Sequence, residues 1–304
     1  MIRSTQSLDP SVPPVADVPP STSESRVPAR AEAAWTENAP SRSWFPRIDL
    51  PELWASRELV VILALRNVKV RYKQTLLGVA WSVLQPLAGV AIFTVVLGRL
   101  AKVPSEGIPY PVFVFAGLAL WMYFSNAANA GAESLVQYRD LVTKVYFPRL
   151  LAPLAAILPG LIDLGISLLA VGVFMVVFGV APSIAIVFLP LWILLTVLVT
   201  FGVALWLSAL NARYRDVRNA LAFLLQIWLF ATPVVFPSTL VHGGWRFLLA
   251  LNPVAGLVEV FRWSLIGTPA PGAWVLVSFT IGFFVLLSGL VYFARVQRRF
   301  ADFI

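Results

Sequence analysis

The chain has 304 residues, of which 59% are hydrophobic and only 12% are charged, with a formal net charge of +8 at pH 7. It holds no Cys and a single His, His242, which excludes disulfides, thiol nucleophiles and thiolate or histidine-cluster metal sites. Its Lys and Arg lie in short segments between apolar stretches, whereas nucleic-acid-binding proteins gather cations on one water-exposed face. We therefore expect no nucleic-acid partner. Because an α-helix needs about 20 apolar residues to cross a bilayer, the composition indicates an integral membrane protein.

The first 55 residues differ from the rest of the chain. The segment Met1–Pro51 contains nine of the 23 prolines, is rich in Ser, Glu and Arg, and has no apolar periodicity. Such a composition cannot bury enough apolar surface to offset the entropy lost on folding. We expect residues 1–55 to form a disordered cytoplasmic tail, without the apolar run of a cleavable signal peptide.

Residues 56–76 are predicted to form an amphipathic helix. At 100° per residue, several apolar side chains fall on one narrow arc: Val61, Leu65, Val68 and Tyr72. Basic side chains flank this arc: Arg66, Lys69, Arg71 and Lys73. The pattern is typical of a helix in the membrane plane whose cations reach the lipid phosphates. The alternative is a solvated basic helix packed on a soluble domain.

Residues 77–304 are predicted to form one transmembrane domain of six helices. The expected spans are 77–98, 110–130, 150–178, 183–210, 219–236 and 273–294. With a cytoplasmic N-terminus, fourteen of the Lys and Arg beyond the tail fall on the inner side and four on the outer side. The positive-inside rule then favours six spans with both termini in the cytoplasm.

The apolar stretch 231–266 is interrupted by helix-breaking pairs. They are Thr232-Pro233, Phe236-Pro237, Gly243-Gly244 and Asn252-Pro253. The pieces between them are too short to cross a bilayer. Broken backbone is tolerated at membrane depth only where it is buried in protein or lines water, so we expect two short re-entrant outer helices at about 238–266. A seventh span would instead place the C-terminal arginines outside.

Few residues carry candidate chemistry, and none favours an enzyme. None of the four lysines lies in a GxxxxGK[ST] loop, so we expect no P-loop nucleotide site in this chain. Asp163 is the one acid well inside an apolar run, which by default suggests a functional group such as a proton relay. The alternative is a structural, interior-facing carboxylate satisfied by Ser167 one turn on. Glu259 and Arg262 lie three residues apart and can pair on one helix face, either as a local ion pair or as a clamp at an extracellular exit.

Aromatic side chains are abundant in or beside the predicted spans. Stacked rings guide sugar chains in many proteins, but aromatic belts at membrane interfaces use the same residues. Channel or gate candidates are Trp81, Trp121, Tyr123, Phe124 and Trp228, together with Glu259 and Arg262. Position in the sequence does not separate the two interpretations.

Four segments, in order, resemble a known family. They are Leu65–Leu87 (LRNVKVRYKQTLLGVAWSVLQPL), Leu141–Arg149 (LVTKVYFPR), Asn211–Val217 (NARYRDV) and Leu251–Val254 (LNPV). This part of the chain, about residues 56–304, is similar to the permease subunit of type-2 ABC exporters for lipid-linked polysaccharides, which serve O-antigen, capsule and teichoic acid export. The O-antigen branch is the best match, and the Pro-rich tail is not part of the pattern.

The resemblance implies an all-α homodimeric permease in the bacterial inner membrane that moves an undecaprenyl-linked polysaccharide, with two copies of a separate ATPase subunit that hold ATP and Mg. This chain itself is then expected to carry no cofactor and no metal. The resemblance implies an interface or gate helix at 56–76, with Arg66, Lys69, Arg71 and Lys73 as contacts of the lipid diphosphate. It also implies an ATPase coupling loop: Tyr138, Arg139, Asp140, Lys144 and Tyr146.

Two other classes of protein remain as alternatives. A secondary transporter would need repeat-related halves and paired ionisable residues in the membrane. A lipid-modifying membrane enzyme would need an acid or His cluster at the interface. Neither pattern is found in the sequence, and a capsule or teichoic acid exporter of the same family stays open as the substrate alternative.

Overall fold

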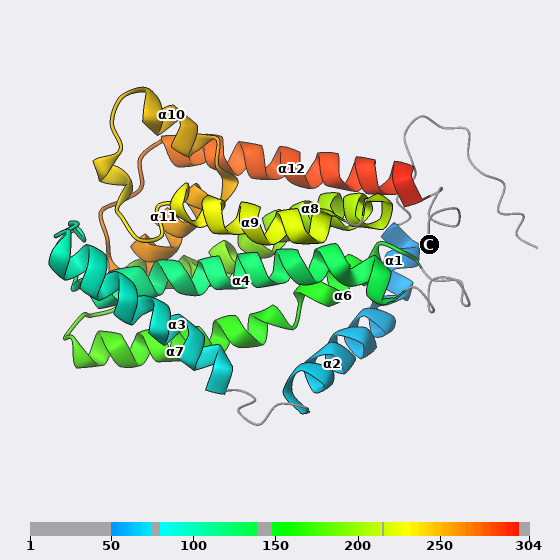
Figure 1. Ribbon diagram of the computed structural model, residues 1–304, viewed down its shortest axis with the longest axis horizontal. Helices are drawn as coiled ribbons and strands as arrows, with labels where there is room; N and C mark the ends of the chain where they lie inside the picture. Colours follow the sequence, from blue (N-terminus) through cyan, green and yellow to red (C-terminus); the bar gives the residue numbers. More distant parts are fainter. Residues whose placement is uncertain (1–49, 74–79, 139–147, 215, 298–304) are drawn as a thin grey trace, which may run out of the picture. The chain divides into compact units, whose positions relative to one another are not determined.

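The computed structural model describes residues 50–73, 80–138, 148–214 and 216–297, shown as ribbons in Figure 1. All regular secondary structure in these ranges is helical. The N-terminal helices are α1 (Leu50–Ala55) and α2 (Arg57–Lys73), and the remaining long helices are α3 (Ala80–Phe93, extended by a π-helical segment Thr94–Leu100), α4 (Tyr110–Gln137), α7 (Gly160–Val177), α8 (Leu189–Arg213), α9 (Val217–Phe230), α11 (Pro253–Ile266) and α12 (Trp274–Val296). Short helices are α6 (Leu151–Ile157), α10 (Gly244–Ala250), and 3₁₀ turns at Ile184–Phe188 and Ser238–Leu240. Most of the predicted tail lies outside the described residues.

Five of the six predicted spans are confirmed as apolar helices of spanning length. They are Ala80–Leu100, Tyr110–Gln137, Leu151–Val177, Ile184–Arg213 and Trp274–Val296. The third consists of α6 and α7, which meet at Pro159. The all-helical membrane architecture expected from the composition is therefore the one observed.

The predicted fifth span, 219–236, is shorter than expected. Helix α9 has 14 residues and ends at Phe230, so it rises about 21 Å, less than the hydrocarbon thickness of about 30 Å. The reason is Pro233, which has no backbone N–H to donate and disfavours helical geometry at Thr232. Beyond it, α10 and α11 form a pair bent by 88°, which is the break that Asn252-Pro253 predicted.

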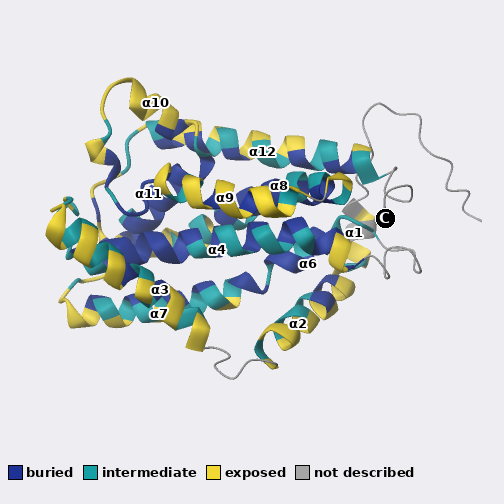
Figure 2. Cartoon of the chain, viewed as in Figure 1, coloured by how far each residue is buried: buried dark blue, intermediate teal, exposed yellow. Residues whose placement is uncertain are grey.

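Helix α4 is the centre of the bundle. It packs against α3, α6, α7, α8, α9 and α11, and Figure 2 shows it buried along most of its length. Its fully buried rings include Phe113, Phe115 and Phe124. The outer helices instead expose large apolar side chains such as Val176 on α7 and Phe284 on α12, as expected for a bundle whose solvent is lipid.

Small residues bring helix backbones together within the bundle. A Cβ on Gly202 of α8 would lie 2.6 Å from the Cα of Leu286 on α12, and one on Gly289 of α12 would lie 2.6 Å from the carbonyl oxygen of Gly202. On the other side of α8, a Cβ on Gly131 would lie 2.4 Å from that of Ala204. Membrane helices associate through such close contacts because lipid gives little hydrophobic driving force between them.

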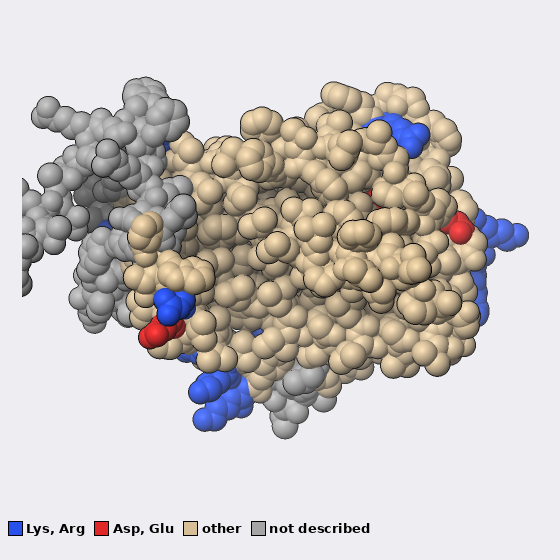
Figure 3. Space-filling model, turned by 180° about the vertical axis from the view of Figure 1, so that it is seen from behind, with Lys and Arg blue, Asp and Glu red and all other residues tan. Residues whose placement is uncertain are grey.

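Few charged side chains lie in the middle of the face that Figure 3 shows. On the face shown in Figure 3, Lys and Arg lie near the two ends and uncharged residues fill the band between them. Such a band is what a hydrocarbon layer requires, because an ionised group at its centre costs several kcal/mol.

Candidate functional site

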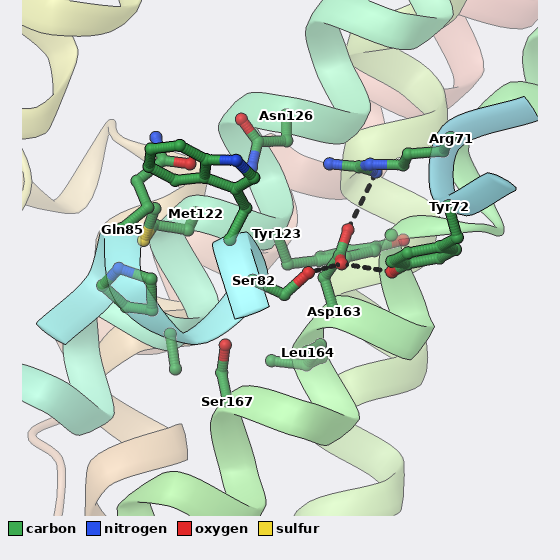
Figure 4. A pocket seen from close by; sticks show the side chains of 14 residues that line it. Arg71, Tyr72, Ser82, Gln85, Met122, Tyr123, Asn126, Asp163, Leu164 and Ser167 are labelled. Carbon is green, nitrogen blue, oxygen red and sulfur yellow. Dashed lines mark hydrogen bonds and ion pairs between the residues drawn. The ribbon is translucent and has the colours of Figure 1, made fainter. Parts of the chain in front are cut away.

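Asp163 lies at the meeting point of three helices. It is in the first turn of α7, and its Oδ1 accepts hydrogen bonds from the hydroxyls of Tyr72 on α2 and Ser82 on α3, each at 2.5 Å. Its Oδ2 lies 2.8 Å from Nη1 of Arg71 on α2. Figure 4 shows the three side chains converging on the carboxylate. We call these four residues the Asp163 cluster.

The cluster differs from the sequence-based expectation in its partners. Ser167 makes no hydrogen bond to Asp163, and the cation comes from outside the spans. Burial raises the pKa of Tyr72 above its usual value of 10.0, so the phenol stays protonated and can donate at neutral pH. The carboxylate thus holds the C-terminal turn of α2 and the first turn of α3 against α7.

Helix α2 packs against the bundle mainly with side chains outside the apolar arc predicted from the sequence. Val60 and Leu63 are buried, and α2 packs on α6. Of the predicted arc, Val61 and Leu65 are 55% and 52% exposed and free to meet lipid, whereas Val68 and Tyr72 are half-buried. The basic residues Arg66, Lys69, Arg71 and Lys73 are all exposed.

A second contact fixes the middle of α2. The Tyr138 hydroxyl donates to Oδ1 of Asn67 at 2.7 Å, and Nδ2 of Asn67 donates to the carbonyl of Ala155 at 3.3 Å. Burial raises the pKa of Tyr138. Tyr138 caps α4 at its C-terminal end and is the one predicted coupling residue that the structure describes. The others lie outside the described residues: Arg139, Asp140, Lys144 and Tyr146.

Three of the predicted channel or gate aromatics pack against one another, and one of them, Trp228, also lines a cavity of about 710 Å³. The ring centroids of Trp121 and Phe124 on α4 and Trp228 on α9 lie 5.1 to 6.4 Å apart. Trp121 and Phe124 are buried, so in this chain they hold α9 against α4. Trp81 differs, because its side chain is 56% exposed.

Arg262 is fully buried among backbone carbonyls. Its Nε donates to Phe113 at 3.2 Å, its Nη1 donates to Pro233 at 2.6 Å, and its Nη2 donates to Val234. Its guanidinium also lies 3.8 Å from the ring centroid of Phe113. The expected ion pair with Glu259 is not formed: Glu259 accepts instead from the Ser238 hydroxyl at 2.6 Å.

Asn252 ties the end of α9 to the start of α11. Its Oδ1 accepts from Nε1 of Trp228 at 3.0 Å and from the backbone N–H of Val254 at 3.1 Å, which caps α11. Its Nδ2 donates to the carbonyl of Ala231 at 3.2 Å and to the Thr232 hydroxyl at 2.9 Å. Arg262 and Asn252 thus donate hydrogen bonds to the backbone carbonyls of this break, those of Ala231, Pro233 and Val234.

Two adjoining cavities lie beside the Asp163 cluster. The first, of about 190 Å³, is lined by residues of α2, α3, α4 and α7, and the second, of about 320 Å³, lies between α2, α4 and the segment around α6. Arg71 and Asn126 line both. Gln85 and Asn126 are not among the residues predicted from the sequence, although a polar amide within an apolar span is a signal that could identify them.

No group of three or more His, Cys, Asp or Glu side chains gathers in the described part of the chain in a way that could hold a metal.

The chain matches known proteins over most of this architecture. The family described as ABC-2 type transporter matches residues 58–266, from α2 to the end of α11. The chain belongs to the ABC-2 type transporter family. It is 34% identical over 217 residues to the O-antigen export system permease protein RfbA of Myxococcus xanthus, which covers 69% of this chain and 81% of that protein.

Two further relatives agree with this assignment. An O-antigen export system permease protein RfbA of Klebsiella pneumoniae is 26% identical over 246 residues, covering 81% of this chain and 94% of the relative. The polysialic acid transport protein KpsM of Escherichia coli is 26% identical over 213 residues, covering 67% and 79%. As a member of this family the chain is a membrane permease, and the resemblance stated from its motifs is confirmed.

Proposed function

We propose that this chain is the membrane-spanning subunit of an ATP-driven exporter that moves undecaprenyl-linked polysaccharide, most specifically O-antigen, across the bacterial inner membrane. The observation that carries the proposal is the exposed surface of α2. There, Arg66 and Lys69 stand beside the exposed apolar side chains of Val61 and Leu65. A site for a diphosphate attached to a polyprenyl chain needs cationic side chains for the phosphates and apolar side chains for the lipid at the same depth in the membrane. The O-antigen permeases among the relatives support the choice of glycan.

The cations of α2 are proposed to bind the diphosphate. Lys and Arg held at headgroup depth form charge-assisted hydrogen bonds to phosphate oxygens, which are roughly twice as strong as neutral ones. Arg66, Lys69 and Lys73 are exposed and form none of the ion pairs found in the described residues. Arg71 is already paired with Asp163, so its role combines holding α2 with contacting the ligand.

ATP hydrolysis is assigned to a separate subunit, in two copies, with ATP and Mg bound there. The absence of a GxxxxGK[ST] loop supports this division. The ATPase is proposed to dock on residues 138–146, next to the point where Tyr138 contacts Asn67 of α2. A movement of this loop, caused by the docked ATPase, would then be transmitted to α2 through the hydrogen bond between Tyr138 and Asn67. Two copies of this chain are proposed to form the channel.

The orientation is also a proposal. Both termini are placed in the cytoplasm, because the positive-inside count favours an inward-facing C-terminal end for α4 and for α8. This orientation requires α9 and the turn that follows it, residues 217–236, to form the sixth crossing. Helices α10 and α11 then belong to the outer side as a re-entrant gate, held in place by Arg262 and Asn252. Their 88° bend supports such a turn within the layer.

Copurification tests the proposal. The tagged full-length chain is purified from native membranes in mild detergent, and bound proteins are identified by mass spectrometry. We expect a P-loop ATPase in about equal amount, and ATP hydrolysis only in its presence. ATP hydrolysis by the isolated chain, or a stable active permease with no ATPase bound, would contradict the proposal and favour a secondary transporter.

A capsular polysaccharide is the second candidate substrate, because the KpsM relative covers two thirds of the chain. Mass spectrometry of the lipid-linked glycan that accumulates when the chain is deleted separates the two candidates. An O-antigen repeat unit on undecaprenyl diphosphate supports the first.

A further inference from the structure

The cavity of about 190 Å³ beside the Asp163 cluster is lined by polar side chains, and some of them have no hydrogen-bond partner among the described residues. Its walls include Arg71, Trp81, Gln85, Tyr123, Asn126 and Asp163. Figure 4 shows the labelled members arranged around it, with side chains from α2, α3, α4 and α7. Of these groups, Asp163 accepts hydrogen bonds from Tyr72 and Ser82 through Oδ1 and forms an ion pair with Arg71.

Three other groups have no hydrogen-bond partner among the described residues. The Tyr123 hydroxyl is buried without a partner, in a side chain that is only 2% exposed. The amides of Asn126, which is half-buried, and of Gln85, which is exposed, also make no side-chain hydrogen bond there, and both lie within spanning helices. Burying a polar group in an apolar environment without a hydrogen-bond partner is unfavourable. These side chains therefore fit a cavity that receives a polar ligand.

The side-chain groups without a hydrogen-bond partner, one phenol and two amides, indicate which kind of ligand the cavity can bind. An amide both donates and accepts, and a phenol does the same, which matches hydroxyl groups better than it matches a phosphate. Because the charge of Arg71 is offset by Asp163 at 2.8 Å, the cavity has no free cation for an anion. An acyl chain would leave the amides and the phenol unpaired. The exposed indole of Trp81 adds an apolar wall.

We propose that this cavity binds the first sugar ring of the lipid-linked glycan, next to the diphosphate. The inference rests on the proposed function, which places the diphosphate on the basic surface of α2. Arg71 lines the cavity and belongs to that surface, so it marks the junction between the two subsites. At about 190 Å³, below the roughly 300 Å³ of pockets for drug-sized ligands, the cavity holds one ring and not an oligosaccharide.

The test compares lipids with and without a sugar. The full-length protein in lipid nanodiscs is titrated with undecaprenyl diphosphate and with undecaprenyl diphosphate that carries one glucose or one N-acetylglucosamine. We expect at least one sugar-bearing lipid to bind about tenfold more tightly than the sugar-free lipid, which corresponds to one or two added hydrogen bonds.

Variants assign that preference to the cavity. In Asn126→Leu and Gln85→Leu, the preference should fall to less than about twofold while the affinity for undecaprenyl diphosphate stays unchanged. The unchanged affinity shows that each variant is folded. The matched control is Asn129→Leu, one turn further along α4, because Asn129 lines the second cavity but not the first. It should keep the full preference.

The negative results distinguish failure of the sugar subsite from failure of the proposed function. Equal binding of all three lipids to the wild type, or a full preference in both Leu variants, overturns the sugar subsite and leaves the diphosphate site standing. Failure of every lipid to bind overturns the proposed function as well.

Discussion

Nη1 of Arg262 donates to the carbonyl oxygen of Pro233 at 2.6 Å, so a side chain of α11 fixes the break that ends α9. Because α9 ends at Phe230, the carbonyls of Pro233 and Val234 have no helical partners, and the guanidinium supplies their donors instead. The broken segment is therefore held in one conformation, as an outer gate would require when it is closed.

Replacing Arg262 should loosen this region. In Arg262→Met, the buried carbonyls of Pro233 and Val234 lose their donor, which should lower the free energy of unfolding by about 3 kcal/mol. Thermal unfolding in detergent measures the loss, and limited proteolysis should show faster cleavage around residues 231–243. The control is Arg246→Met, because Arg246 is exposed on α10. Equal stability of the two variants would show that the Arg262 contacts add nothing.

The pair Arg71–Asp163 should be coupled energetically. A double-mutant cycle with Arg71→Ala and Asp163→Ala is expected to give an interaction energy of about 1 kcal/mol or more, because Asp163 is only 14% exposed. Arg218 and Glu133 form the matched control pair at the same 2.8 Å distance, but both are well exposed. Their cycle should give less than about 0.5 kcal/mol. Similar values for the two pairs would remove Asp163 as the anchor of α2.

Gly202 is predicted to be required for packing of α8 on α12. An added Cβ would lie 2.6 Å from the Cα of Leu286, which is backbone and cannot rotate away. Gly202→Ala should therefore destabilise the protein by about 1–3 kcal/mol. Gly165→Ala on α7 is the control, since nothing lies within 4 Å of its Cβ, and it should leave the melting temperature unchanged or slightly raised. The prediction fails if the two variants melt together.

Topology can be tested with single cysteines, because the native chain has none. Cysteines at the exposed positions Pro104 and His242 should react with an impermeant thiol reagent added outside the inner membrane. A cysteine at Asn219, exposed at the start of α9, should be protected until the membrane is permeabilised. Outside labelling at Asn219 would reverse the proposed orientation and remove α10 and α11 from the outer gate.

The sequence predicted the helices better than their contacts. Span boundaries follow from apolar length and from breakers such as Asn252-Pro253, which act locally. The predicted fifth span, 219–236, extends six residues beyond the end of α9 because it includes Thr232-Pro233, although that pair is also one of the predicted helix breaks. That reading gave apolar composition more weight than the missing backbone donor of proline.

The site could be predicted only in part, because its contacts join distant residues. Tyr72 and Asp163 are 91 residues apart, and no local pattern specifies that α2 meets α7 there. Residue spacing suggested that Glu259 and Arg262 would pair. Arg262 instead binds carbonyls of a break whose position depends on tertiary packing. The basic residues of α2 could be proposed from the sequence because they lie close together within one segment, and the structure shows that they are exposed.

The most direct test of the central claim follows the glycan in cells. In a strain that lacks this chain, undecaprenyl-linked polysaccharide should accumulate on the cytoplasmic side and disappear from the surface, and the wild-type chain should restore export. The triple variant Arg66→Gln, Lys69→Gln, Lys73→Gln should assemble with the ATPase yet fail to restore surface polysaccharide, because the diphosphate loses its cationic contacts. Normal surface polysaccharide in the deletion strain would contradict the export function, and normal surface polysaccharide in the triple variant would show that α2 is only a membrane anchor.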